Sequence, residues 1–159
     1  MKKLKLYIET SVWSHLVADD APEARRTAEA LFADVGAYEI CVSDLVFQEI
    51  GRTRDETKRR MLRDLVERHQ PEILISDEEE VVALAKRYIA EGVIPPSARD
   101  DAIHVATAVV EGVDVLVSLN MRHIVHVRTR RGINGINKME GYREIEIATP
   151  EEVATHGEE

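Results

Sequence analysis

Four side chains whose oxygens can bind a metal ion lie near predicted strand ends or helix starts. Glu9 directly follows the first predicted strand, and Glu49 lies in the helix predicted after the second strand. Asp101 opens a later helix, and Asn120 follows the strand to which that helix leads. The carboxyl ends of parallel strands share one edge of a sheet, where α/β proteins bind ligands. The sequence therefore predicts that these residues meet at one site.

The predicted site has the chemistry of a hard divalent cation. Three carboxylates and a carboxamide offer oxygen ligands, which suit Mg²⁺ or Mn²⁺ better than zinc. Such an ion polarises a phosphoryl oxygen and lowers the pKa of a bound water, so phosphodiester hydrolysis needs no protein nucleophile. Neighbouring residues that could orient a ligand or meet a substrate are Thr10, Ser11, Asp100, Arg122 and His123.

Each of these residues also has an ordinary structural interpretation. An Asp in the first turn of a helix is often a cap or a partner of the helix dipole, and an Asn after a strand often forms a turn. Thr10 and Ser11 could equally cap the helix that follows them. His104 is more typical of a packed or exposed helix histidine than of a ligand. Several acids must converge on one place before a function is favoured.

The stretch 97–124 combines the elements that would position two of the four residues. Asp100 and Asp101 open a helix whose apolar residues recur at helical spacing, so one of its faces is expected to be buried. Gly112 ends the helix, and 113–118 is a β-branched run typical of a strand covered on both faces. Asn120 follows where the chain leaves the sheet.

The rest of the chain alternates predicted strands and helices. Strands are expected at 5–8, 38–43, 72–76, 113–118 and 142–148. Helices are expected at 12–16, 22–35, 44–50, 51–69, from 77 onward, from 100 to 111 and at 121–127, with another beginning at 149–152. Residues 128–141 contain three glycines and two asparagines and are expected to form a loop. This alternation predicts a three-layer α/β/α sandwich around a mainly parallel, five-stranded sheet.

Length and composition predict one soluble domain with an aliphatic core. The chain has 159 residues, 44% of them hydrophobic but few aromatic, so we expect a domain over 1–150 and an acidic tail over 151–159. No apolar run approaches ~18 residues, and the start lacks the apolar segment of a signal peptide, so a cytoplasmic protein without membrane contact is expected. The single cysteine, Cys41, lies in an apolar run and is expected in the core.

The net charge of −9 argues against indiscriminate binding to nucleic acid. The basic residues are nevertheless concentrated in one stretch, so a local basic surface that tracks a phosphate backbone is possible on this acidic protein. A solvated loop is the ordinary alternative. The residues concerned are Arg122, Arg128, Arg130, Arg131, Lys138 and Arg143.

Four motifs in order resemble those of the PIN-domain family of metal-dependent ribonucleases, which includes the toxins of VapBC toxin–antitoxin pairs. The motifs are YIETSVWS (7–14), VSDLVFQEI (42–50), DAIHVATA (101–108) and LVSLNMRHI (116–124). Their order and spacing cover nearly the whole chain. The resemblance implies a PIN-type fold with Glu9, Glu49, Asp101 and Asn120 at the positions of the family's acids. This sequence departs from the family pattern at two positions. Glu9 stands where the family's first acid is most often Asp, and the neutral Asn120 stands at the fourth position, which is often Asp.

The resemblance implies Mg²⁺- or Mn²⁺-dependent cleavage of RNA, a homodimer, and a small antitoxin partner bound near the acids. Asp100 could exchange roles with Asp101. Two alternatives stay open. Glu9 and the neutral Asn120 could leave a catalytically weakened module that binds RNA or a protein. Another metal-dependent phosphohydrolase is also possible, although the chain lacks a glycine-rich phosphate loop after its first strand.

Overall fold

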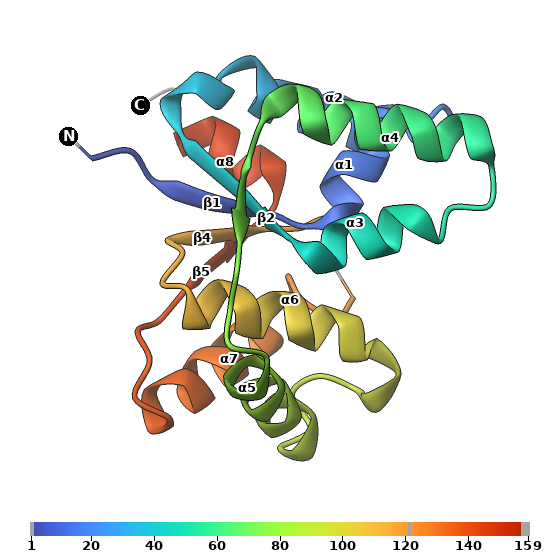
Figure 1. The fold of residues 1–159 in the computed structure, drawn as a ribbon. Coiled ribbons are helices and arrows are strands. Elements are labelled where there is room, and N and C mark those ends of the chain that lie inside the picture. The colour runs from blue at the N-terminus through green and yellow to red at the C-terminus, as the bar shows by residue number, and fades with distance from the viewer. Residues whose placement is uncertain (1, 121, 157–159) are drawn as a thin grey trace.

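A parallel five-stranded sheet lies at the centre of the computed structural model, which describes residues 2–120 and 122–156. The strand order is β3-β2-β1-β4-β5, and each pairing is parallel (Figure 1). The strands are β1 (Lys5–Ile8), β2 (Glu39–Ser43), β3 (Glu72–Leu74), β4 (Val115–Val117) and β5 (Glu146–Ala148). The predicted α/β fold is confirmed, with β3, β4 and β5 shorter than expected.

Helices cover both faces of this sheet. On one face α1, α2, α4 and α8 pack together, and on the other α6 and α7 pack against α5 (Figure 1). The helices are α1 (Thr10–Leu16), α2 (Pro22–Ala33), α3 (Asp44–Gly51), α4 (Glu56–His69), α5 (Glu78–Ala90), α6 (Arg99–Val110), α7 (Val127–Met139) and α8 (Pro150–His156). Short 3₁₀ turns occur at Val35–Ala37 and Pro96–Ala98.

The core is mainly aliphatic, as its composition requires, and it includes the neighbouring strands β1 and β4. Residues 6–8 of β1 are fully buried, because layers of helices cover both sides of these central strands. Trp13 of α1 packs against Phe32, and its indole N–H donates to the carbonyl of Ile8 at 3.1 Å. Cys41 is buried as predicted, and burial raises the pKa of its thiol to about 12.

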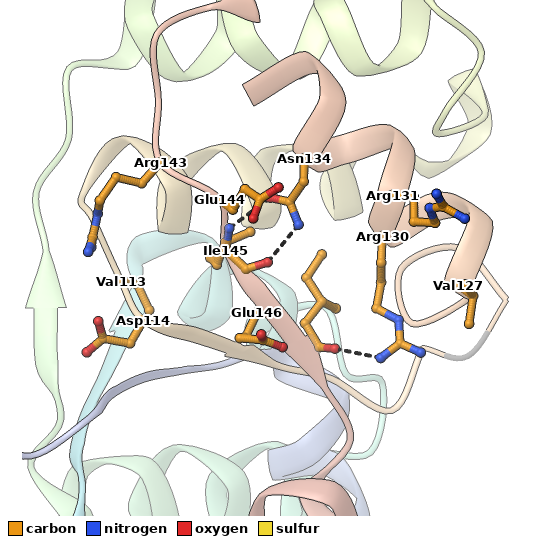
Figure 2. Close-up of a pocket in the computed structure, with 11 residues that line it drawn as sticks. Val113, Asp114, Val127, Arg130, Arg131, Asn134, Arg143, Glu144, Ile145 and Glu146 are labelled. Carbon is orange, nitrogen blue, oxygen red and sulfur yellow. Dashed lines mark hydrogen bonds between the residues drawn. The ribbon is translucent and has the colours of Figure 1, made fainter. Parts of the chain in front are cut away.

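The expectation of a loop over 128–141 is wrong, because this stretch forms α7. Ile133 and Ile136 recur at helical spacing and are buried, and this packing outweighs the low helix propensity of the two glycines nearby. Asn134 also ties the helix to the sheet, since its side chain bonds both the amide and the carbonyl of Ile145 (Figure 2).

Arg130 of α7 also bonds a backbone group of β5. Its guanidinium donates to the carbonyl of Ile147 at 3.0 Å, so side chains of α7 occupy backbone groups at the edge of the sheet (Figure 2). Satisfied edge groups do not offer a template for another strand.

The short helix expected at 121–127 is not formed over 122–126, where the chain makes turns instead. Met121 lies outside the described residues. The helix expected at 149–152 is present as α8, which packs on α2 and buries Val153. Of the segment expected to be a tail, 157–159 lie outside the described residues. Within the part of the chain that the structure describes, no helix has the length and apolarity needed to cross a membrane.

Two glycines of α7 provide a matched test of this helix. A Cβ at Gly135 would meet nothing within 4 Å, whereas one at Gly132 would lie 3.0 Å from both γ-carbons of Val93. We expect Gly135→Ala to raise the free energy of unfolding by about 0.5–1 kcal/mol, because alanine is the better helix former. Gly132→Ala should gain less or lose stability. Urea unfolding of the two variants checks this, and equal effects would contradict the packing of α7 against Val93.

Candidate metal centre

The sheet brings the ends of its two central strands together, and Glu9 and Asn120 come with them. The backbone amide of Glu9 donates to the carbonyl of Val117 in β4 at 3.0 Å, so the residue after β1 lies beside the end of β4. Glu9 is also the N-cap of α1, where its side chain accepts from the amide of Ser11. The helix start therefore holds an acid at the carboxyl edge of the sheet.

Glu9 is buried, and one of its two oxygens takes all of its hydrogen bonds. Its exposed fraction is 4%. Oε2 accepts from the amide of Ser11 at 3.2 Å, from the hydroxyl of Ser118 at 2.9 Å and from the hydroxyl of Ser11. Oε1 accepts from none of the described residues and lies 3.9 Å from Nε2 of His104. The second oxygen is therefore available to a ligand.

Glu49 follows the same pattern on α3. Its Oε1 accepts from the hydroxyl of Thr10 at 2.8 Å and from Nε2 of His104, whereas Oε2 takes no hydrogen bond from the described residues. Glu9, Glu49 and His104 form a set whose potential ligand atoms all lie within 4.8 Å of one another. Two of the predicted acids thus meet, and a histidine lies between them.

Asp101 is held in a second, adjoining group. Its Oδ2 accepts from the side-chain amide of Asn120 at 2.8 Å and from the ring of His123 at 3.2 Å, which leaves Oδ1 without a described donor. Oδ1 of Asn120 in turn accepts from the backbone amide of His123 at 3.1 Å. Asp101 is not in the 4.8 Å set, so the structure pairs it with Asn120 more closely than with Glu49.

The three acids therefore share one arrangement, with one oxygen fixed by protein donors and the other free of them. Ligating carboxylates in metalloproteins are characteristically held in this way by hydrogen bonds from behind. The donor set of carboxylate oxygens, one of them on a residue that is almost fully buried, fits a divalent cation. The arrangement could bind such an ion and hold water beside it.

The electrostatics of the site reflect the crowding of acids. Burial and then the charge of Glu9 raise the pKa of Asp101 above its usual value, against a weaker effect of His123. Burial alone would lower the pKa of His104. The hydrogen bond to Glu49 and the neighbouring carboxylate charges outweigh burial and raise it. In the absence of a cation, burial and the neighbouring negative charge therefore make ionisation of Asp101 less favourable.

The flanking residues divide into those that orient acids and those that do not. Thr10 and Ser11 do so directly, since their hydroxyls bond Glu49 and Glu9. Asp100 instead pairs with Arg52 at 2.6 Å, in a partly exposed contact. Arg122 is exposed and has no polar contact with the described residues.

Sequence reasoning missed three contributors to the site. Ser118 at the end of β4 donates to Glu9, and Tyr7 and Ser43 join a buried hydrogen-bonded chain that ends at His104. Polar residues in otherwise apolar strands were the available signal, because a buried hydroxyl requires a partner.

The model of the PIN domain matches residues 6–128. The chain belongs to the PIN-domain family. The resemblance drawn from the four motifs is thereby confirmed. No protein of curated function matches the sequence.

Solved structures share the fold of this PIN-domain protein. A chain of VapBC2 from Rickettsia felis, in a structure bound to a DNA fragment from their promoter, matches with a TM-score of 0.56 and 12% identity. The match covers 92% of this chain and 98% of that one. A chain of FitAcB from Neisseria gonorrhoeae matches with a TM-score of 0.56 and 11% identity, over 91% and 97% of the two chains. At such identities the likeness concerns the fold.

Removal of the charge at position 101 should stabilise the protein in the absence of metal. An acid whose pKa is raised by folding binds more protons when folded, so its ionisation costs stability as the pH rises from about 3.9 through the raised value. In EDTA at pH 7, we expect Asp101→Asn to raise the free energy of unfolding by about 1 kcal/mol, or about 2–4 °C in the melting midpoint. The gain in stability should disappear near pH ~3.5, below the usual pKa of Asp, because the carboxyl is then mostly protonated in both the folded and the unfolded state.

Asp100→Asn is the matched control for this measurement. It removes a charge from the same first turn of α6 and therefore has the same effect on the helix dipole. Because Asp100 pairs with Arg52, its neutralisation should leave stability unchanged or slightly lower. If Asp101→Asn were the less stable of the two, Asp101 would not be under electrostatic strain.

Proposed function

We propose that this PIN-domain protein is a metal-dependent endoribonuclease. The observation that carries the proposal is the arrangement of Glu9, Glu49 and Asp101, each with one anchored and one free carboxylate oxygen, at the carboxyl edge of a PIN fold. Membership of the PIN-domain family supports the nuclease class. The choice of RNA as substrate, and of Mg²⁺ or Mn²⁺ as the ion, rests on the resemblance of the motifs and on the oxygen donors.

In this proposal each polar residue has a defined task. Glu9 and Glu49 bind the ion through their free oxygens, and Asp101 binds it directly or holds one of its waters. Asn120 donates to Asp101 and so keeps that carboxylate turned toward the site. When bound, the ion polarises the scissile phosphate and acidifies water, which is the chemistry that phosphodiester hydrolysis requires.

Substrate contact is proposed for the basic residues that the fold leaves unengaged. Arg130 is used within the protein, since it bonds Ile147 and pairs with Glu152. Arg122, Arg128 and Arg131 are exposed and have no ion pair with the described residues. On a protein of net charge −9, exposed cations that make no ion pair would favour contact with a phosphate backbone.

We also propose that the protein is the toxin of a toxin–antitoxin pair. The support is the likeness to a chain of VapBC2 and to a chain of FitAcB. A small antitoxin that places a basic side chain among the acids would relieve the charge repulsion there. A homodimer, which rests on the family resemblance, and a cytoplasmic location, which rests on the hydropathy of the sequence, are part of the same proposal.

The second candidate is a catalytically weakened module that binds RNA or a protein. It is favoured by the two departures from the family pattern, since Glu9 is one methylene longer than Asp and the neutral Asn120 leaves the site less negative than four acids would. The two candidates differ in metal binding, because a weakened module would show neither heat nor a thermal shift with Mn²⁺.

The function is tested by cleavage of a labelled RNA in Mg²⁺ or Mn²⁺, with EDTA and single-stranded DNA as parallel reactions. Asp101→Asn should lower the cleavage rate by at least about 10²-fold, because the free oxygen loses its negative charge. Asp100→Asn makes the same chemical change one residue away, on a side chain that pairs with Arg52, and should stay within a few-fold of wild type.

Three results would contradict the proposal. Cleavage that persists in EDTA would exclude the metal. Equal losses in the two variants would remove Asp101 from its special role. Hydrolysis of small phosphoesters in place of RNA would favour the phosphohydrolase alternative.

A further inference from the structure

A buried chain of hydrogen bonds runs from the end of β2 to Glu49. Oγ of Ser43 lies 2.6 Å from the hydroxyl of Tyr7, which lies 2.6 Å from Nδ1 of His104. Nε2 of the same ring bonds Oε1 of Glu49, and the hydroxyl of Thr10 donates a second hydrogen bond to that oxygen. Tyr7 and His104 are fully buried, so water does not substitute for these partners.

The direction of the proton donors in this chain follows from its last member. A carboxylate oxygen can only accept, so Nε2 of His104 carries a proton and donates to Glu49. With a neutral ring, Nδ1 accepts from Tyr7, and Tyr7 must then accept from Ser43. With a charged ring, Nδ1 donates to Tyr7, which donates to Ser43. In both cases Glu49 receives the same bond, so the chain fixes one oxygen of Glu49 whatever the state of the ring.

We propose that His104 is a positioning residue, which the buried Ser43–Tyr7 pair orients so that its Nε2–H holds the metal-binding carboxylate of Glu49. The alternative that His104 itself ligates the ion is less well supported. It requires Nε2 to give up its proton and its bond to Glu49. That loss would also leave the carboxylate with Thr10 as its remaining described donor.

This positioning also explains why Glu9 and Glu49 tolerate each other. Nε2 of His104 is bonded to Glu49 and lies 3.9 Å from the free oxygen of Glu9. A donor in this position lowers the cost of two neighbouring carboxylates and holds Oε1 of Glu49 in place, so that its other oxygen stays available to an ion. The inference rests on the proposed metal-dependent function.

The test measures Mn²⁺ affinity by calorimetry, together with the pulsed electron paramagnetic resonance of the bound ion. His104→Leu removes the donor and should weaken Mn²⁺ binding by about 10–100-fold, the usual range when a group behind a ligand is lost. His104→Gln can place an N–H near the position of Nε2, so it should restore most of the affinity. The spin-echo spectrum of wild type should show no coupling to a directly bonded nitrogen.

Tyr7→Phe provides a second variant, should the buried His104→Leu protein fail to fold. This variant deletes the hydroxyl that bonds His104, which in turn bonds Glu49. It should weaken Mn²⁺ binding measurably, but less than His104→Leu does. Tyr88→Phe is the matched control, because Tyr88 is also fully buried and its hydroxyl donates to Asn137 and not to a residue of the site. It should cost similar stability and leave Mn²⁺ affinity unchanged.

The possible results separate the positioning role from the function on which it rests. Nitrogen coupling in the wild type would make His104 a ligand and overturn the proposal. The positioning role would also be contradicted if Tyr7→Phe bound Mn²⁺ as tightly as Tyr88→Phe. The same holds if a folded His104→Leu protein bound Mn²⁺ as tightly as wild type. A wild-type protein that binds no Mn²⁺ would overturn both ideas. The expected affinities without RNA cleavage would support the positioning role and overturn the nuclease.

Discussion

The crowding of three neighbouring carboxylates, one buried and two partly buried, is the constraint on which the rest of the site depends. Charges that leave water require donors, and carboxylates that face one another without a cation repel. The protein answers by giving each acid at least two donors on one oxygen. These donors come from Thr10, Ser11, His104, Ser118, Asn120 and His123. The opposite oxygens accept from none of the described residues, so the same bonds that make burial tolerable also define the side from which a cation would bind.

The fold supplies much of this arrangement at little additional cost. Glu9 occupies the N-cap of α1, and Asp101 lies in the first turn of α6, where exposed backbone amides already favour a negative charge. Ser118 directly follows β4, so its hydroxyl reaches Glu9 from the end of the adjacent strand. Elements that the parallel sheet needs for its own packing therefore carry the acids and their donors to one edge.

The sequence was sufficient for the fold class and for the general location of the site. Glu9 and Asn120 follow strands, and parallel strands must end at one edge, so their convergence could be predicted from the hydrophobic pattern alone. The role of His104 could not. Its partner Glu49 is 55 residues away in sequence, and their contact depends on how α3 and α6 are placed against β1. A histidine on an apolar helix face is compatible with packing alone.

The error at α7 has a different cause. Gly132 and Gly135 favour a loop in the sequence pattern, because glycine lowers helix propensity. Burial of Ile133 and Ile136 decided the outcome, and one glycine lies where Val93 leaves little room for a side chain. Local propensity and tertiary packing disagreed here, and packing prevailed.

The two departures from the family pattern can be judged from these contacts. Asn120 donates its side-chain N–H to Asp101, a bond that a second carboxylate could not make. An Asp at this position would face Asp101 with like charge, in a site where the pKa of Asp101 is already raised by Glu9. The amide therefore replaces repulsion with a hydrogen bond that fixes one oxygen of Asp101. Glu9 likewise both caps α1 and presents a free oxygen toward Glu49 and His104. The neutral residue at 120 removes one charge and orients another, so this departure from the family pattern is compatible with the proposed nuclease.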